Sequence, residues 1–195
     1  MARKDYDVIT EWINPNSRIL DLGCGDGSLL KLLNVKRNTS GYGVDSSIDK
    51  TIKSLDNNIN ILNVDINDYM GYFKNKSFDF VILAQSLQVV DNPVLLIKEM
   101  LRVGNEVIIS FPNMGHWKSR LYLFLRGEMP VTKELPYNWH STPNIHLCTI
   151  SDFKKMCKIN SFEIIDEVVN STNGRNISSN YFNNLFGVSA IFRIK

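Results

Sequence analysis

A carboxylate and a glycine-rich turn stand next to each other near the start of the chain. Residues 18–27 read Arg-Ile-Leu-Asp-Leu-Gly-Cys-Gly-Asp-Gly, so Asp21 comes two positions before the first glycine. The apolar residues ahead of the turn are typical of a buried strand, and a helical pattern begins at Ser28. Three glycines in such a turn let the backbone approach a ligand where a Cβ atom would collide. The turn is therefore a candidate ligand site.

The spacing of the glycines distinguishes between two classes of nucleotide cofactor. Nicotinamide sites use G-x-G-x-x-G and rest a pyrophosphate on the helix N-terminus. Here the glycines run G-x-G-x-G, and the carboxylate of Asp21 would repel a phosphate. A ligand with a cationic ammonium and a sulfonium suits this carboxylate better, which favours S-adenosylmethionine or its demethylated product, S-adenosylhomocysteine.

A second carboxylate strengthens this interpretation. Asp45 closes the predicted strand Gly-Tyr-Gly-Val-Asp, 24 positions after Asp21. A carboxylate at the end of the second strand can accept hydrogen bonds from both hydroxyls of a ribose. The acid, the glycine turn and the second acid in this order are more specific than either element alone.

Asp65, after the third predicted strand, has two interpretations. Its carboxylate can accept from an adenine amino group while the backbone N–H of Ile66 donates to a ring nitrogen, or it caps a helix starting near Asn67. The sequence does not separate them. Gln85, at the carboxyl end of the fourth strand, is a candidate for cofactor contact through its backbone. We expect Asp79 to be only a strand-start residue.

The complete predicted site contains no metal. We expect cofactor contacts from Asp21, Gly23, Cys24, Gly25, Gly27, Asp45, Ser46, Asp65, Ile66 and Gln85.

Short apolar runs alternate with helical patterns up to about residue 111, which indicates an α/β fold of right-handed βαβ units around a mostly parallel sheet. The predicted strands are 17–22, 41–45, 59–64, 79–84 and 106–111, with two closing strands at 162–169 and 188–194. The expected architecture is a single Rossmann-like domain with a seven-stranded sheet flanked by helices.

Helices are expected between these strands. Residues 48–55 repeat apolar side chains on one helical face, and Asp91-Asn92-Pro93 fits the start of another helix, with a cap residue and a proline in the first turn. We expect both helices to cover the sheet. Thr149, three positions before Asp152, resembles a capping box, and residues 181–186 fit one or two helical turns.

Residues 111–148 interrupt the alternation of strands and helices. They hold all three histidines, two of the three tryptophans and four of the six prolines. A loop this long inside a compact domain usually has a function. It begins where the fifth strand ends, at the edge where open α/β sheets bind ligands, so we expect a lid inserted over the active site.

Within the predicted lid, one helix has an apolar face and a basic side. The apolar residues are Trp117, Leu121, Phe124 and Leu125, and the basic residues are Lys118, Arg120 and Arg126. Gly127 is placed to end this helix. The apolar face fits a partner, a membrane surface or the core of the protein, and packing onto the core is the ordinary outcome for such a stripe.

No catalytic residue is assigned from the sequence. Methyl transfer from a sulfonium is an in-line displacement that positioning alone accelerates, so the lack of a nucleophilic triad excludes nothing. An acceptor that needs a general base would use a histidine, whose ordinary pKa suits that role. The candidates are His116, His140, His146 and Tyr137. Each of them is more often a structural residue.

Length and composition describe one domain over residues 1–195, with 44% hydrophobic residues available for a core. The 22 basic residues are scattered among 20 acidic ones, so nucleic acid is not the expected partner. Cys24, Cys148 and Cys157 form no C-x-x-C pair, which disfavours zinc and suits reduced thiols. With no signal-peptide pattern and no apolar run near 20 residues, we expect a cytoplasmic protein without a membrane span.

The run Asp-Leu-Gly-Cys-Gly-Asp-Gly with the later Asp45 resembles class I S-adenosylmethionine-dependent methyltransferases over nearly the whole chain. Three further stretches, 110–117, 125–132 and 135–150, resemble the MetW family of methionine biosynthesis. The resemblance implies that the last of the seven strands is antiparallel, and that Asp21, Gly23, Asp45 and Asp65 contact the cofactor. It also implies a partner, the homoserine O-acyltransferase MetX.

Two functions follow from these observations. One is a subunit that binds S-adenosylmethionine or S-adenosylhomocysteine and acts through the acyltransferase, which the family resemblance favours. The other is a methyltransferase acting on a small molecule. A fold whose pocket binds nothing is the third interpretation.

Overall fold

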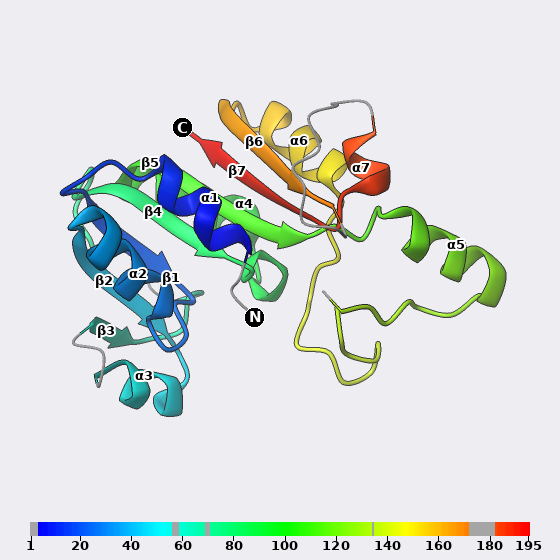
Figure 1. Ribbon diagram of the computed structural model, residues 1–195, viewed down its shortest axis with the longest axis horizontal. Coiled ribbons are helices and arrows are strands. Elements are labelled where there is room, and N and C mark those ends of the chain that lie inside the picture. The colour runs from blue at the N-terminus through cyan, green and yellow to red at the C-terminus, as the bar shows by residue number, and fades with distance from the viewer. Residues whose placement is uncertain (1–3, 56–58, 69–70, 134, 172–181) are drawn as a thin grey trace.

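The computed structural model describes residues 4–55, 59–68, 71–133, 135–171 and 182–195. Seven strands form one sheet in the order β3-β2-β1-β4-β5-β7-β6 (Figure 1). They are β1 (Arg18–Leu22), β2 (Ser40–Asp45), β3 (Asn60–Asn63), β4 (Phe78–Ala84), β5 (Gly104–Pro112), β6 (Ile164–Asn170) and β7 (Ser189–Ile194). All neighbouring strands are parallel except at β7, which is antiparallel to both β5 and β6. The predicted seven-stranded α/β fold is confirmed.

Seven α-helices and one short 3₁₀ helix connect the strands in the described part of the chain. They are α1 (Lys4–Trp12), α2 (Ser28–Arg37), α3 (Ile48–Leu55), η1 (Leu87–Val89), α4 (Pro93–Val103), α5 (Trp117–Arg126), α6 (Ile150–Ile159) and α7 (Asn183–Phe186). The sequence analysis did not predict α1 or η1. Residues 172–180 of the polar loop between the closing strands, and Tyr181, lie outside the described residues.

The core has a layer on each face of the sheet. On one face, Ile9 of α1 and Leu33 of α2 are fully buried. On the other, Met100 of α4 lies in the same buried cluster as Phe153 of α6, whose ring contacts that of Phe192 from β7. Large apolar side chains buried on both faces are the pattern expected of a mostly parallel sheet covered by helices.

The strand order reverses at β1, which lies between β2 and β4. In sheets of this kind the crevice at such a switch point, outside the carboxyl ends of the strands, is where ligands bind. The turns that follow β1, β2 and β4 therefore meet at one edge of the sheet. This edge carries the glycine turn and Asp45.

Capping side chains begin two of the helices as the sequence predicts. Asn92 accepts a hydrogen bond from the backbone N–H of Leu95 (3.1 Å), one residue before Pro93. Thr149 accepts from the backbone N–H of Asp152 (3.1 Å) and donates its hydroxyl to the Asp152 carboxylate (2.7 Å). Each cap satisfies an N–H group that the first helical turn leaves unpaired.

The sequence predicts that α3 covers the sheet and leaves three coverings open for the apolar face of α5, and in the structure both helices keep apolar side chains exposed. On α3, Ile48 is 64% and Ile52 57% exposed, and the side chain at 55 is not described. The neighbouring edge strand β3 has only four residues, so it offers little apolar surface to cover. On α5, Phe124 is 85% exposed, because the chain leaves β5 and carries this helix beyond the end of the sheet (Figure 1).

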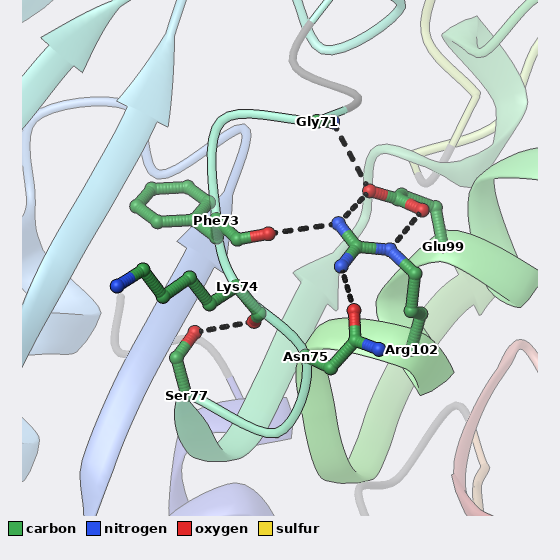
Figure 2. A network of polar contacts seen from close by, with 7 residues as sticks. All are labelled: Gly71, Phe73, Lys74, Asn75, Ser77, Glu99 and Arg102. Carbon is green, nitrogen blue, oxygen red and sulfur yellow. Dashed lines mark hydrogen bonds and ion pairs between the residues drawn. The ribbon is translucent and has the colours of Figure 1, made fainter.

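A network of hydrogen bonds and an ion pair joins the connection between β3 and β4 to α4 (Figure 2). Arg102 donates to both carboxylate oxygens of Glu99 (2.5 and 2.8 Å), to the carbonyl of Phe73 (2.8 Å) and to the side chain of Asn75. Glu99 also accepts from the backbone N–H of Gly71 (3.2 Å). These contacts hold a connection that lacks a helix of its own in the described residues.

Candidate functional site

A cavity of about 240 Å³ lies at the carboxyl ends of β1 and β4. Its lining residues are Tyr6, Asp21, Gly23, Cys24, Gly25, Asp26, Leu29, Lys50, Ala84, Gln85 and Ser86. The cavity therefore brings together five residues of the predicted cofactor site, one of them on β1, three in the turn after it and one after β4. The other five predicted residues lie outside the lining.

The glycine turn has a conformation that side chains disfavour. Gly23, Gly25 and Gly27 have φ angles of 70°, 61° and 75°, in the left-handed region. The backbone N–H groups of Gly23 and Cys24 both donate to the carbonyl of Val44 (2.7 and 3.1 Å), which ties the turn to β2. A Cβ atom on Gly25 would have no neighbour within 4 Å, so the backbone here faces open space that a ligand can use.

Asp45 is buried beside this turn, with 8% of its surface exposed. One carboxylate oxygen accepts from the backbone N–H of Gly25 (2.8 Å) and the other from that of Ser47 (2.9 Å). A carboxylate offers about four acceptor positions, so these two bonds leave acceptor capacity for two hydroxyls. Asp45 thus fits a ribose, although it is not one of the cavity-lining residues. Ser46 is exposed.

Two carboxylates, Asp21 and Asp26, and one ammonium, Lys50, line the cavity. The pKa of the Cys24 thiol is raised well above its usual range, first by burial and then by the carboxylates of Asp21 and Asp45. Asp21 itself is buried on β1, with 2% of its surface exposed. Carboxylates that disfavour a thiolate at this position favour a cation there. The charge of the site therefore suits an ammonium or a sulfonium rather than a phosphate.

The region of Asp65 matches neither interpretation fully. Its carboxylate accepts from the backbone N–H of Asn67 (2.8 Å) and shapes a tight turn, so the predicted helix near Asn67 is absent from described residues 65–68. Ile66 lies near the glycine turn, since its Cδ1 atom is 4.0 Å from where a Cβ of Gly23 would stand. A contact with adenine stays a prediction for both residues.

Gln85 stands at the end of β4 with a φ of 58°. Its backbone N–H donates to the carbonyl of Ser110 (2.9 Å), and its carbonyl accepts from the side chain of Gln88 (2.8 Å). Both backbone groups that were expected to contact the cofactor therefore have partners within the protein. At the opposite end of the same strand, Asp79 accepts from the backbone N–H of Arg18 (2.8 Å), as its strand-start role predicts.

Sequence reasoning missed the contribution of α1 to the site. Tyr6 lines the cavity, and Asp5 is buried and accepts from the hydroxyl of Ser110 (3.0 Å) on β5. A periodic signal was present, because Tyr6, Ile9 and Ile13 follow helical spacing. The charged residues between them obscured it. Lys50 of α3 was missed as well.

The candidate catalytic residues are dispersed. The ring Nδ1 of His116 accepts from the backbone N–H of Lys118 (3.3 Å), so this histidine caps α5. His140 packs edge-on against Trp139, and Tyr137 is 52% exposed. None of the candidates belongs to the lining of the cofactor cavity in the described structure.

His146 lines a second cavity of about 200 Å³, which is largely apolar. The remaining lining residues are Leu87, Gln88, Pro93, Phe111, Pro112, Leu135, Leu147, Cys148, Asp152, Phe153 and Met156. The two cavities are neighbours along the chain, because Ser86 lines one and Leu87 the other. The carbonyl of Gln88 accepts from the backbone N–H groups of Ile145 (2.8 Å) and His146 (3.0 Å), which brings the β5–α6 connection (residues 113–149) over this edge.

Among the described residues, no group of three or more His, Cys, Asp or Glu side chains is arranged to hold a metal ion. No helix in the described part of the chain combines the length and hydropathy needed to cross a bilayer.

Solved structures with this fold are S-adenosylmethionine-dependent methyltransferases and related proteins. One from Mesorhizobium loti has a TM-score of 0.72 at 13% identity, with 99% of this chain and 98% of that chain covered. The plantazolicin methyltransferase BpumL, solved with S-adenosylhomocysteine, has a TM-score of 0.65 at 18% identity, with coverage of 98% and 80%. The cyclase SpnF scores 0.69 at 17% identity with the same coverage, so the fold alone does not define a reaction.

The fold is therefore that of the class I methyltransferases. The family model "Methionine biosynthesis protein MetW" matches residues 3–194, and the chain belongs to this family. A curated relative from Rhodopirellula baltica, the "Bifunctional methionine biosynthesis protein MetXA/MetW", is 35% identical over 161 residues. That match covers 78% of this chain and 26% of the relative, so the chain spans about a quarter of the relative's length.

Proposed function

We propose that this protein is a subunit that binds S-adenosylmethionine or S-adenosylhomocysteine and acts with a homoserine O-acyltransferase of the MetX type in methionine synthesis. The observation that carries the proposal is the relative in which a MetXA part and a MetW part form one polypeptide. Fusion keeps two parts at a high effective concentration, which is useful when they work on each other. The proposed location is the cytoplasm, and neither nucleic acid nor a membrane span is part of the proposal.

The residues at the switch point suit the cofactor. Asp45 would accept from the ribose hydroxyls, and Asp21 would face the positive charge of the amino acid part. The open backbone at Gly25 leaves room for the ligand. At Gly23 the corresponding space is occupied, because Ser86 Oγ lies 2.6 Å from where a Cβ of Gly23 would stand. Asp65 and Ile66 would meet the adenine. When bound, S-adenosylmethionine supplies a methyl group on a sulfonium.

A continuous set of contacts supports regulation of the partner by the cofactor. Gln85 lines the cofactor cavity, its carbonyl accepts from the Gln88 side chain, and the Gln88 carbonyl accepts from Ile145 and His146. A ligand that binds one arrangement of these residues more tightly shifts the population toward it. The arrangement of the β5–α6 connection would thus differ between the complexes with S-adenosylmethionine and with S-adenosylhomocysteine.

The direct test uses the purified acyltransferase from the same organism. Its activity is measured alone, with this protein, and with this protein plus S-adenosylmethionine or S-adenosylhomocysteine. The proposal expects a stable complex and an activity that depends on this protein and differs between cofactor forms. An acyltransferase that neither binds this protein nor changes its activity contradicts the regulatory function.

A methyltransferase acting on a small molecule is the second candidate. The observation in its favour is the largely apolar second cavity, because its lining residue Leu87 directly follows Ser86 of the cofactor cavity in the chain. Under this function, Asp45→Ala abolishes cofactor binding and methyl transfer together. Transfer that survives in this variant would mean that the cofactor pocket has been assigned to the wrong residues.

A further inference from the structure

We propose that α5 is the docking surface for the acyltransferase, an inference that rests on the proposed function. Five consecutive apolar residues of this helix, 121–125, reach the surface, and Ser119 is its one buried residue in the described structure. The exposed fractions are 40% for Trp117, 45% for Leu121, 42% for Tyr122, 44% for Leu123, 85% for Phe124 and 68% for Leu125. Figure 1 shows the helix extending beyond the end of the sheet.

The start of α5 is fixed, although its apolar side chains are only partly covered. His116 caps the first turn, and Gly127 ends the helix with a φ of 66°. Arg120 donates to the carbonyl of Gly115 (2.6 Å), and the side chain of Asn113 binds the backbone N–H of Gly115 (2.9 Å). These contacts fix the direction in which the helix leaves the domain. A helix fixed in this way loses less conformational entropy when it binds in a groove.

A helix of this length gains little stability by itself. Isolated helices shorter than about 12–15 residues are marginal in water, and most helical stability comes from packing of an apolar face. In this ten-residue helix of the described chain, Phe124 and Leu125 stay 85% and 68% exposed, and the other large apolar side chains keep 40–45% of their surface exposed. A covering surface would supply the missing stabilisation.

The exposed apolar area matches that of a protein interface. With about 200 Å² for a large side chain, the exposed fractions of the six apolar residues leave roughly 600 Å² of apolar surface on this helix. A standard interface buries about 800 Å² on each partner. Because residues 121–125 are consecutive and surround the helix, a groove that encloses the helix would be needed to cover most of this area.

One observation favours the acyltransferase over both a second copy of this chain and a lipid surface, and the charge of the helix disfavours a second copy. The relative joins a MetXA part to the MetW part, so the two are held together in that protein. The sequence of α5, Trp-Lys-Ser-Arg-Leu-Tyr-Leu-Phe-Leu-Arg, has three basic residues and no acidic one. The expected complement is an apolar groove with acidic residues on its rim, into which Phe124 and Leu125 insert.

The test compares two double variants. Phe124→Ser with Leu125→Ser removes the most exposed apolar residues of α5, and Val35→Ser with Ile159→Ser removes residues that are 77% and 71% exposed on other helices. Affinity for the purified acyltransferase is measured by surface plasmon resonance. Binding of S-adenosylhomocysteine and the thermal unfolding midpoint are measured alongside. The α5 variant is expected to bind the acyltransferase about 100-fold more weakly, while the control variant binds like the wild type.

The outcomes separate this inference from the proposed function. Wild-type affinity in the α5 variant overturns the docking surface but leaves the function intact, whereas a wild-type protein that never binds the acyltransferase contradicts the function itself. If the α5 variant loses cofactor binding, charge reversal by Lys118→Glu with Arg126→Glu provides the second test, and unchanged affinity there overturns the inference. Loss only of self-association in sedimentation, or only of binding to anionic vesicles, also overturns it.

Discussion

The Asp45 carboxylate at the end of β2 accepts a hydrogen bond of 2.8 Å from the backbone N–H of Gly25, in the turn after β1. This bond joins the two elements that the sequence marks as the cofactor site. It also fixes the direction in which the remaining acceptor positions of the carboxylate point. Asp45 therefore has a structural contact and a proposed ligand contact at once.

Asp45→Asn is expected to weaken binding of S-adenosylhomocysteine by about 100-fold, because the ribose hydroxyls lose charge-assisted hydrogen bonds worth about 1.5–3 kcal/mol each. Equilibrium binding of the nucleoside provides the measurement. Asp79→Asn is the matched control, since that carboxylate also accepts a backbone N–H but lies at the opposite end of the sheet. Equal affinities for both variants and the wild type would exclude Asp45 from the site.

Gly25→Ala and Gly127→Ala form a pair that separates backbone strain from ligand contact. Both glycines have left-handed φ angles, 61° and 66°, and neither has an atom within 4 Å of its missing Cβ. Each substitution is expected to cost about 1 kcal/mol of unfolding free energy in chemical denaturation. Only Gly25→Ala should also weaken binding of S-adenosylhomocysteine, because its methyl group occupies the space of the ligand. Full affinity in that variant would show that the ligand does not approach the turn.

The thiols are expected to be unreactive in the folded protein. Burial raises the pKa of Cys148 and of Cys157 to about 12, and that of Cys24 still further. A rise from the ordinary value of 9.0 to about 12 lowers the thiolate fraction near neutral pH by roughly 1000-fold. Alkylation by iodoacetamide at pH 7.5, followed by mass spectrometry, should therefore be slow until denaturant is added. Rapid labelling of Cys24 in the native protein would contradict the environment described for the glycine turn.

The Glu99–Arg102 network predicts a stability that depends on pH. The hydrogen bond from Arg102 lowers the pKa of Glu99, so the folded state binds this proton less tightly than the unfolded state does. The stabilisation is thus complete above the unfolded pKa of about 4.3 and is lost as the pH falls through the lower folded value. Glu99→Gln should reduce the unfolding free energy by about 1 kcal/mol at pH 7. The difference from wild type should shrink below pH 4, and a difference that grows at low pH would have the wrong sign.

Most of the fold could be predicted because local patterns determine it. The alternation of apolar strands and helical faces gave all seven strands within about two residues, and the capping residues Asn92 and Thr149 marked two helix starts. These signals act within a few residues of each other. The antiparallel direction of the last strand came instead from the family resemblance.

The features that the sequence could not predict are contacts between distant elements. An apolar face on α3 or α5 shows what a helix can bury, but not whether a surface is available to cover it. The cap formed by His116 and the internal bonds of Gln85 depend on backbone positions that no spacing in the sequence reveals. The role of Tyr6 required knowing that α1 packs near the carboxyl ends of the strands.

The most direct test of the account is calorimetric titration of the wild-type protein with S-adenosylhomocysteine, with the Asp45→Ala variant in parallel. The account predicts one binding site per chain in the wild type and loss of measurable binding in the variant. No binding to the wild type, or unchanged binding to the variant, would contradict the assignment of this pocket.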